Sequence, residues 1–340
     1  MSIAFVVTAP EPVALASITP LPAALGRTDG VEPPLASAVS GLMGGRVGVY
    51  LRPTDGGMAA MADARRASRS TLRRLGVWAD RLTRFTTTSD LARLNDAPTA
   101  RVAVGPTLAA ALDWARMAEG LSDGIVNVAM LDARLAAEQV EEAATNDPGI
   151  DRSWSMDRGH RQTHVRRSVG LRLDLDGVAK GWLADRALGR LDPFPAAVVD
   201  ADGDVAIRLG RGQRWRVGIA DPRSIGENLL ELDLIGSDRH GGRRFGLATS
   251  GTSVHRWVHD GRVSHHLIDP RTGMPARTDI VQATVLARSA REAEALAKTA
   301  VILGSGAALN VLDRPGVDGA ILLTDGDEIL LTPSTMRWLA

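Results

Sequence analysis

Two lysines stand out as candidates for binding a negatively charged group. Of the 40 Lys and Arg residues in the chain, only Lys180 and Lys298 are lysines. A lysine ammonium is a compact point charge and an arginine guanidinium is a planar fork, so the two are not interchangeable at a tight site. Both lysines are therefore candidates for an anion site. The alternative to a functional role is that a coding bias towards arginine left these two lysines by chance.

The segment DLDGVAKGWLAD, residues 174–185, combines an acidic strand end, a glycine turn and the start of a helix. Free N–H groups at a helix start attract anions, so this arrangement suits a ligand with a phosphate or a polar ring. An acidic turn followed by a capped helix, with Lys180 in solvent, explains the same residues. The segment is not a P-loop, because the Gly-x4-Gly-Lys-Ser/Thr pattern is missing.

A histidine-rich segment, residues 248–276, places His265 and His266 shortly before the turn at 269–273. In that turn the aspartate accepts a backbone hydrogen bond, the proline fixes φ and the glycine adopts a positive φ. A histidine has a pKa near neutral pH and can therefore exchange a proton there.

Two other chemistries suit the same segment less well. His255 and His259 have the spacing of zinc ligands on a helix, but the surrounding sequence is typical of strands and contains no HExxH motif. Ser250 could be a hydrolase nucleophile, but ATSGTS lacks the strand–elbow–helix pattern of G-x-S-x-G. A zinc site and a serine hydrolase are therefore disfavoured.

Two further segments carry charged residues at regular spacings. In AREAEALAKTAVILG, residues 290–304, Glu294 and Lys298 are four residues apart on a predicted helix and can form a salt bridge. The apolar run after Lys298 indicates that the helix is largely packed, with a polar face towards a site. In residues 198–210, three aspartates around Gly203 resemble half of a calcium loop, but the downstream glutamate is missing, which favours a tight turn.

The elements that position these residues indicate an α+β fold, a mostly antiparallel sheet with flanking helices. A strand is expected from Arg46, and helices over 58–82, 106–121, 130–142, 178–190 and 290–304, with a turn at 146–149. Short strands are expected over 171–175, 196–201, 204–209, 214–220, 229–235, 245–250 and 281–287. Most connections between these strands are too short for crossover helices, which favours antiparallel pairing.

Composition excludes several classes of protein. The 40 Lys and Arg residues balance 40 Asp and Glu residues, which argues against a general nucleic-acid binder. With no cysteine, the chain has no disulfide, thiolate nucleophile or iron–sulfur cluster. Prolines interrupt the apolar residues 1–40, so we expect a disordered extension there, neither signal peptide nor transmembrane segment, and a domain over 41–340. The expected location is cytoplasmic.

Taken in order, these segments resemble the ApbE-type FAD:protein FMN transferases, from about Met43 to about Leu331. The specific matches are D-L-x-G-x-A-K-G (Asp174–Gly181), T-S-G (Thr249–Gly251) and H-x-I-D-P-R-T-G (His266–Gly273). Weaker matches are Met43-Gly44, residues 84–95 and residues 122–130. The resemblance implies the ApbE-like, T-fold-related architecture.

The resemblance also implies an activity. Members of this family transfer the FMN half of FAD to a threonine hydroxyl of an acceptor flavoprotein and release AMP. The substrate is then FAD, Mg²⁺ lies on its pyrophosphate, and the protein partner carries a target Thr or Ser. No covalent enzyme intermediate is indicated, because phosphoryl transfer depends mainly on positioning and electrostatic stabilisation.

Site residues follow from the resemblance position by position. His266 would lie beside the reacting phosphate as the catalytic base. Contacts to FAD would come from Met43, Phe85, Ile125, Val126, Asn127, Asp174, Lys180, Ser250, Gly251 and Ile268. The magnesium positions would be the carbonyl of Gly177 and the side chains of Glu294 and Lys298.

The chain departs from the family pattern mainly at the metal. Glu294 stands where relatives have Asp, and Lys298 stands where they have Thr; a protonated lysine cannot ligate a metal. Asn127 and Thr252 also replace acidic residues. Either the ammonium of Lys298 takes over part of the charge neutralisation, with a weaker Mg²⁺ requirement, or Glu294 and Lys298 neutralise each other. The latter would leave a non-catalytic FAD carrier. Hydrolysis of FAD to FMN and AMP is a second enzymatic alternative.

Overall fold

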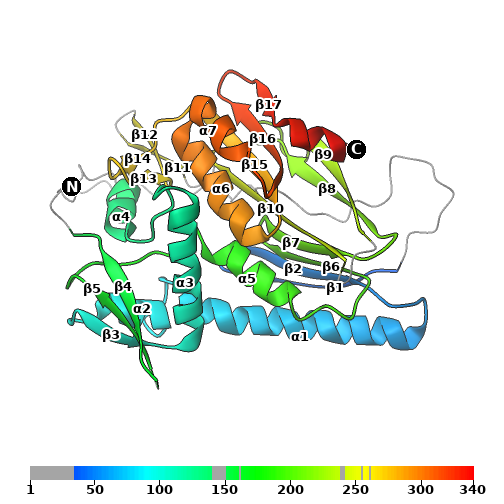
Figure 1. Cartoon of the computed structure of the whole chain (residues 1–340), viewed down its shortest axis with the longest axis horizontal. Coiled ribbons are helices and arrows are strands. Elements are labelled where there is room, and N and C mark those ends of the chain that lie inside the picture. Colours follow the sequence, from blue (N-terminus) through cyan, green and yellow to red (C-terminus); the bar gives the residue numbers. More distant parts are fainter. Residues whose placement is uncertain (1–33, 140–150, 161, 238–241, 254–255, 260–261) are drawn as a thin grey trace, which may run out of the picture.

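The computed structural model describes residues 34–139, 151–160, 162–237, 242–253, 256–259 and 262–340, and an eight-stranded sheet runs through its centre (Figure 1). In order across this sheet, the strands are β1 (Ala36–Leu42), β2 (Gly45–Arg52), β6 (Ala196–Ala201), β7 (Asp204–Leu209), β10 (Arg243–Gly251), β15 (Ile280–Ala287), β16 (Val317–Thr324) and β17 (Ile329–Leu331). Every neighbouring pair is antiparallel, as the short connections predict. The turn expected between β6 and β7 is confirmed, with positive φ at Asp202 (61°) and Gly203 (92°).

Helices cover one face of the sheet (Figure 1). The helix α1 (Met58–Leu82) packs on β1 and β2, α5 (Ala179–Leu188) on β6 and β7, and α6 (Ala290–Leu303) on β10 and β15. The last helix on this face, α7 (Ser305–Leu312), packs against α6 and β16. Apolar side chains of the helices and strands meet in one continuous core beneath α1 and α5.

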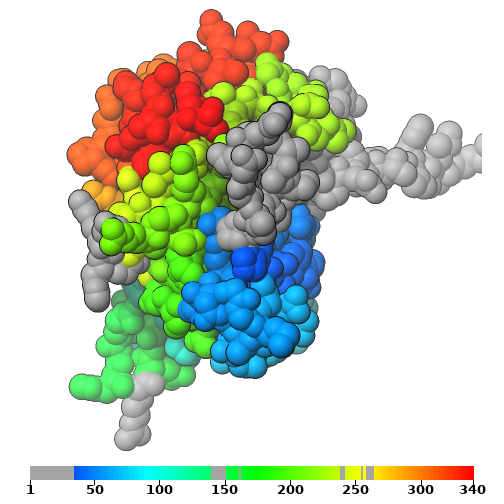
Figure 2. Space-filling model, turned by 90° about the vertical axis from the view of Figure 1, so that its right-hand side faces the viewer, coloured from blue at the N-terminus to red at the C-terminus, as the bar shows by residue number. Residues whose placement is uncertain are grey.

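A hairpin covers the other face. It consists of β8 (Arg214–Ala220) and β9 (Asn228–Ile235), and the C-terminal 3-10 helix η1 (Pro333–Trp338) lies beside it. Figure 2 shows the red C-terminal segment against the yellow-green hairpin, where Leu232 bridges Leu339. Because both faces of the sheet are covered, every residue of β6 and β7 is buried, including the charged side chains of Asp200, Asp204 and Arg208.

A smaller lobe flanks the helical layer (left in Figure 1). It contains α2 (Asp90–Asp96), β3 (Arg101–Val104), α3 (Pro106–Leu121), α4 (Leu131–Gln139), β4 (Trp154–Arg158) and β5 (Thr163–Arg167). Two short hairpins lie beside α4: β11 (Arg256–His259) with β12 (Arg262–His265), and β13 (Ile268–Asp269) with β14 (Met274–Pro275). Because α3 packs on α1, α5 and α6, the lobe is joined to the main sheet through the helices.

Two helices that carry site residues are locked together. The Asp185 carboxylate of α5 accepts the backbone N–H groups of Ala290 (3.0 Å) and Arg291 (3.1 Å) at the start of α6. A Cβ on Gly181 would lie 2.6 Å from the carbonyl oxygen of Ala290, so only glycine allows this approach. The side chain of Asp185 on α5 therefore caps the start of α6, and the backbones of the two helices touch at Gly181 and Ala290.

The structure corrects several sequence-based expectations. The predicted strand at 171–175 is wrong: the chain is extended there but belongs to no sheet. The expected domain boundary after residue 40 falls inside β1, so residues 36–40 are part of the central sheet. The helix expected over 130–142 is observed at Leu131–Gln139, and the expected turn at 146–149 lies outside the described residues. The helices over 58–82 and 106–121 are confirmed.

Across the ranges described above, no helix is both long enough and apolar enough to span a membrane.

Candidate active site

A cavity of about 510 Å³ opens between the β1–β2 turn, the end of α1 and the start of α5. Met43 and Gly44 form the two-residue turn, both with positive φ (57° and 79°), which is the turn that fits a twisted hairpin. The lining residues are Leu42, Met43, Gly44, Ala79, Asp80, Leu82, Thr83, Arg84, Phe85, Thr86, Asp174, Leu175, Asp176, Ala179, Lys180 and Leu183. Four of the predicted FAD contacts, from three distant parts of the sequence, therefore meet in one cavity: Met43, Phe85, Asp174 and Lys180.

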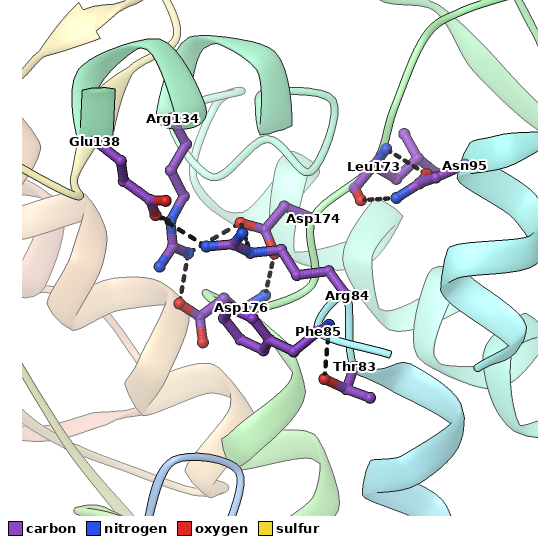
Figure 3. Close-up of polar contacts among 9 residues, drawn as sticks. All are labelled: Thr83, Arg84, Phe85, Asn95, Arg134, Glu138, Leu173, Asp174 and Asp176. Atoms are coloured by element: carbon purple, nitrogen blue, oxygen red, sulfur yellow. Dashed lines mark hydrogen bonds and ion pairs between the residues drawn. The ribbon is translucent and has the colours of Figure 1, made fainter. Parts of the chain in front are cut away.

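The floor of the cavity is the extended segment before α5. The side chain of Asn95 pairs with the backbone of Leu173 in both directions, at 2.8 Å each, in place of a neighbouring strand (Figure 3). The N–H of Asp174 donates to the carbonyl oxygen of Val128 (2.8 Å), and the N–H of Asp176 donates to Asp174 Oδ1 (3.1 Å). These bonds fix where both carboxylates lie.

A network of ion pairs forms one wall of the cavity (Figure 3). Arg134 of α4 bonds to Asp174 (2.9 Å), to Glu138 (3.0 Å) and to Asp176. Arg84 bonds to Glu138 (2.9 Å) and lies 4.0 Å from Asp174. In this network, which we call the arginine wall, each of the three carboxylates faces at least one guanidinium.

Phe85 is the large apolar side chain at the edge of this wall, and it is 75% exposed. The guanidinium of Arg84 lies 4.3 Å from the centre of its ring, and the backbone N–H of Phe85 donates to Thr83 Oγ1 (3.1 Å). An exposed aromatic ring held in this way is a surface on which a planar ring system can stack.

On the opposite side of the cavity, Lys180 lies beside a group of acids, of which Asp200 and Asp204 are buried. Lys180 Nζ lies 3.6 Å from Asp202 and 4.0 Å from Asp204. Burial alone would lower the pKa of Lys180, but Asp204, Asp176 and Asp202 outweigh it and raise that pKa. Burial raises the pKa of Asp200 to about 7 and also raises the pKa of Asp204.

Gly177, Glu294 and Lys298, the three predicted magnesium positions, lie close together, but they place an ammonium and a buried carboxyl where a metal ion was expected. The Nζ atom of Lys298 lies so close to Gly177 that a Cβ built there would collide with it. Glu294 is buried and accepts the N–H of Gly181 through Oε2 (3.0 Å), while its Oε1 has no hydrogen-bond partner. Burial raises the pKa of Glu294 well above its ordinary value and lowers the pKa of Lys298.

These residues do not fit a magnesium ion. Mg²⁺ requires oxygen ligands in octahedral geometry, whereas an ammonium only donates hydrogen bonds. Among the residues with described positions, no group of three or more His, Asp or Glu side chains could hold a metal. The predicted metal ligation by Gly177, Glu294 and Lys298 therefore has no complete ligand set to support it.

His266 is close enough to Asp176 of the cavity lining to help hold the pKa of that carboxyl below its ordinary value. The neighbouring His265 is buried and fully used: its Nδ1 accepts from the N–H of Leu267 (3.3 Å), so Nε2 donates to the Ala276 carbonyl oxygen (3.0 Å). Asp269 is bonded to Arg271 through both carboxylate oxygens. Of these candidates for a base, His266 is therefore the one that acts electrostatically on a residue lining the cavity.

The predicted contacts at 125–127 lie behind the cavity floor and do not line it. Ile125 and Val126 are buried, 7% and 1% exposed, and belong to the hydrophobic core. The side chain of Asn127 accepts the backbone N–H of Ala129 (2.8 Å). This segment supports the floor through the bond between Val128 and Asp174.

Ser250, Gly251 and Ile268 also lie outside the cavity lining. Ser250 and Gly251 are at the end of β10, opposite Ala283 and Gln282 of β15. Ile268 is buried and packs in a small cluster with residues of and next to α4. The structure thus does not gather these three residues with Met43 and Lys180 in one pocket.

Arg84, Arg134, Glu138 and Asp176 line or support the cavity but were not among the residues expected at the site. Asp176 stands inside the matched motif, so its position next to Asp174 was an available signal. Arg134 and Glu138 are spaced i, i+4 on a predicted helix, which indicates an ion pair, but nothing in the sequence directs that pair to Asp174.

Known proteins resemble this chain along most of its length. The ApbE family profile matches residues 43–321. The FAD:protein FMN transferase of Treponema pallidum is 31% identical over 265 residues, 70% of this chain and 71% of that protein. The enzyme of the same name from Salmonella typhimurium is 29% identical over 191 residues, so that this chain spans about half (52%) of it.

Solved structures show the same fold. The ApbE protein of Thermotoga maritima superimposes with a TM-score of 0.74 at 22% identity, covering 90% of this chain and all of that one. The fold and the family profile agree, and this chain belongs to the ApbE family.

Proposed function

We propose that this protein is an FAD:protein FMN transferase. It binds FAD, transfers the FMN half to a threonine or serine hydroxyl of an acceptor flavoprotein, and releases AMP. The observation that carries the proposal is the cavity shared by Met43, Phe85, Asp174 and Lys180 in a chain of the ApbE family. Treponema pallidum and Salmonella typhimurium relatives bear that enzyme's name.

The reaction exchanges the phosphoanhydride bond of the FAD pyrophosphate for a new phosphoester bond to the acceptor. The acceptor hydroxyl oxygen attacks the phosphorus on the FMN side of the pyrophosphate, and the bond from that phosphorus to the AMP oxygen breaks. AMP leaves with the electron pair of that bond, and the hydroxyl proton passes to a base. His266 is our proposed base, because it stands in the matched H-x-I-D-P-R-T-G motif close to Asp176 of the cavity lining, whereas His265 and Asp269 are committed to their own turn.

The residues of this chain bind and orient the substrate. The exposed ring of Phe85 offers a stacking surface for a flavin or adenine ring, and Lys180 faces the cavity with a positive charge. Ile125, Val126 and Asn127 support the floor that carries Asp174. Ser250, Gly251 and Ile268 are further FAD contacts in this proposal, on the strength of the motifs that contain them. We assign Mg²⁺ no role in the reaction, because Gly177, Glu294 and Lys298 do not form a ligand set that fits it.

The test combines the purified chain with FAD and a candidate acceptor, such as a redox-pump subunit or a flavin-carrying reductase. We expect AMP release and a fluorescent acceptor band on a denaturing gel, both lost when the target threonine is replaced by alanine. AMP and free FMN without acceptor labelling would indicate hydrolysis of FAD. Intact FAD would indicate a carrier, the alternative favoured by the altered metal site. The cytoplasmic location stays a prediction that cell fractionation tests.

A further inference from the structure

The second lysine of the chain lies against the cavity floor from behind. Lys298 is on α6, and its Nζ packs directly over the backbone of Gly177, between the lining residues Asp176 and Lys180. The carboxylates of Asp174 and Asp176 and the guanidinium of Arg134 act on its charge. Lys298 forms no ion pair or hydrogen bond with any residue that the structure describes.

The simplest alternative role for Lys298 is a surface ion pair with Glu294 on the same helix. The structure argues against it, because Glu294 Oε1 has no hydrogen-bond partner although a lysine stands one helical turn away. Glu294 is also buried, and its other oxygen is engaged with Gly181. The ammonium thus packs over Gly177, behind the cavity lining, and although its charge and that of Glu294 act on each other, the two side chains form no ion pair.

Composition gives an independent argument for the same place. Thirty-eight of the 40 Lys and Arg residues are arginines, and the two exceptions both interact electrostatically with Asp176. The planar guanidinium of an arginine is wider than the ammonium of a lysine. It would therefore not fit in the space over Gly177 that the ammonium fills. Gly177 matters for the same reason, since any Cβ would displace the ammonium.

We propose that the Lys298 ammonium, held over Gly177, is the resident cation for the pyrophosphate of FAD, so that this protein binds FAD without a divalent metal ion. The inference rests on the proposed function for the identity of the ligand. It explains together why the metal ligand set is incomplete, why Gly177 is a glycine and why a lysine is retained on α6.

The first experiment measures FAD affinity by flavin fluorescence quenching, in EDTA and in excess Mg²⁺. The wild type is expected to bind FAD equally well in both, within about twofold. Lys298→Met should weaken binding at least about tenfold in both solutions, the loss typical of a hydrogen bond to a charged group. Lys298→Thr should bind weakly in EDTA and regain affinity with Mg²⁺. Arg74→Met, at an exposed position on α1, is the control and should match the wild type.

The second experiment tests the contact itself with a double-mutant cycle. Gly177→Ala should weaken FAD binding by displacing the ammonium, and the double variant with Lys298→Met should be no worse than either single variant. Gly120→Ala, where a Cβ meets nothing within 4 Å, is the matched control. Thermal unfolding of each variant shows whether it is folded, so a loss of affinity is separated from a loss of structure.

The outcomes separate this inference from the proposed function. Tight FAD binding by the wild type only with Mg²⁺, or equal affinities for wild type and Lys298→Met, would overturn the role of Lys298 and leave the transferase intact. Additive losses in the cycle would overturn the Gly177 contact. If the wild type bound no FAD in either solution, the proposed function itself would fail.

Discussion

The two sides of the cavity differ in how completely their charges are paired. On the arginine wall, Arg84 and Arg134 are bonded to Asp174, Asp176 and Glu138, and both arginine side chains are largely buried. On the opposite side, Lys180 is shared among several acids, and Lys298, which lies behind the lining, has no ion pair among the described residues. A paired network holds the structure together, whereas buried charges without full partners indicate where a charged ligand binds. The comparison therefore separates scaffold from binding site.

The largest expected effect concerns the proposed base. His266→Ala should reduce FMN transfer by about 10²–10⁴-fold, the usual loss of a general base, with FAD affinity little changed. Transfer is measured as AMP release, and affinity by fluorescence quenching. The matched control is His164→Ala on the exposed lobe strand β5, which should keep full activity. Near wild-type transfer by the His266 variant would show that another group accepts the proton.

Next in size is the effect of breaking the arginine wall. Arg134→Met leaves three carboxylates with one fewer cation, and we expect the free energy of unfolding to fall by about 2–3 kcal/mol. Lys298→Met should change it by less than about 1 kcal/mol, because no ion pair with a described residue is lost. Urea denaturation of both variants checks this. A larger loss of unfolding free energy for Lys298→Met than for Arg134→Met would mean that Lys298, and not the arginine wall, holds the structure together.

A smaller effect is expected from pH. The pKa of Asp200 is raised to about 7 by burial, from an ordinary value of 3.8. The folded protein then binds a proton more tightly than the unfolded chain does. This contribution to stability is present at about pH 4 and is lost as the pH rises through about 7. Asp200→Asn should flatten the dependence of the unfolding free energy on pH, whereas Asp96→Asn, at an exposed position, should leave the slope unchanged.

The smallest expected effect on stability concerns Phe85, at the edge of the arginine wall. Phe85 is 75% exposed, so Phe85→Ala should change stability by no more than about 0.5 kcal/mol. FAD affinity should still fall about fivefold or more, because a stacking surface is lost. Phe85→Trp should keep the affinity. An unchanged affinity for the alanine variant would remove Phe85 from the binding site.

The sequence predicted the elements whose patterns repeat over many residues. Apolar residues at helical spacing located α1 and α3 to the residue. The alternating LRLDL at 171–175 has the pattern of a strand, but its partner is the side chain of Asn95, which no periodicity encodes. The strand β1 was missed because most residues of ASAVSGL are small, and because it pairs only at the sheet edge.

The candidate site was predictable where its residues stand in one motif. Asp174, Gly177 and Lys180 lie within seven residues, and their segment suits an anion site, with an acidic turn before a capped helix as the alternative. Arg134 was not predictable, since its contact with Asp174 joins residues 40 positions apart through the packing of α4 on the cavity wall. The packing of Lys298 over Gly177 likewise depends on how α6 docks on α5.

The backbone contact between α5 and α6 has a consequence for recognition. The Asp185 cap and the Gly181 contact hold the two helices as one rigid body, so the distance between the lysines they carry is set before a substrate arrives. The two positive charges then lose little conformational entropy on binding, and a ligand is preferred whose negative charges match that spacing. A phosphodiester too short to reach both lysines would be rejected by geometry, without any steric block.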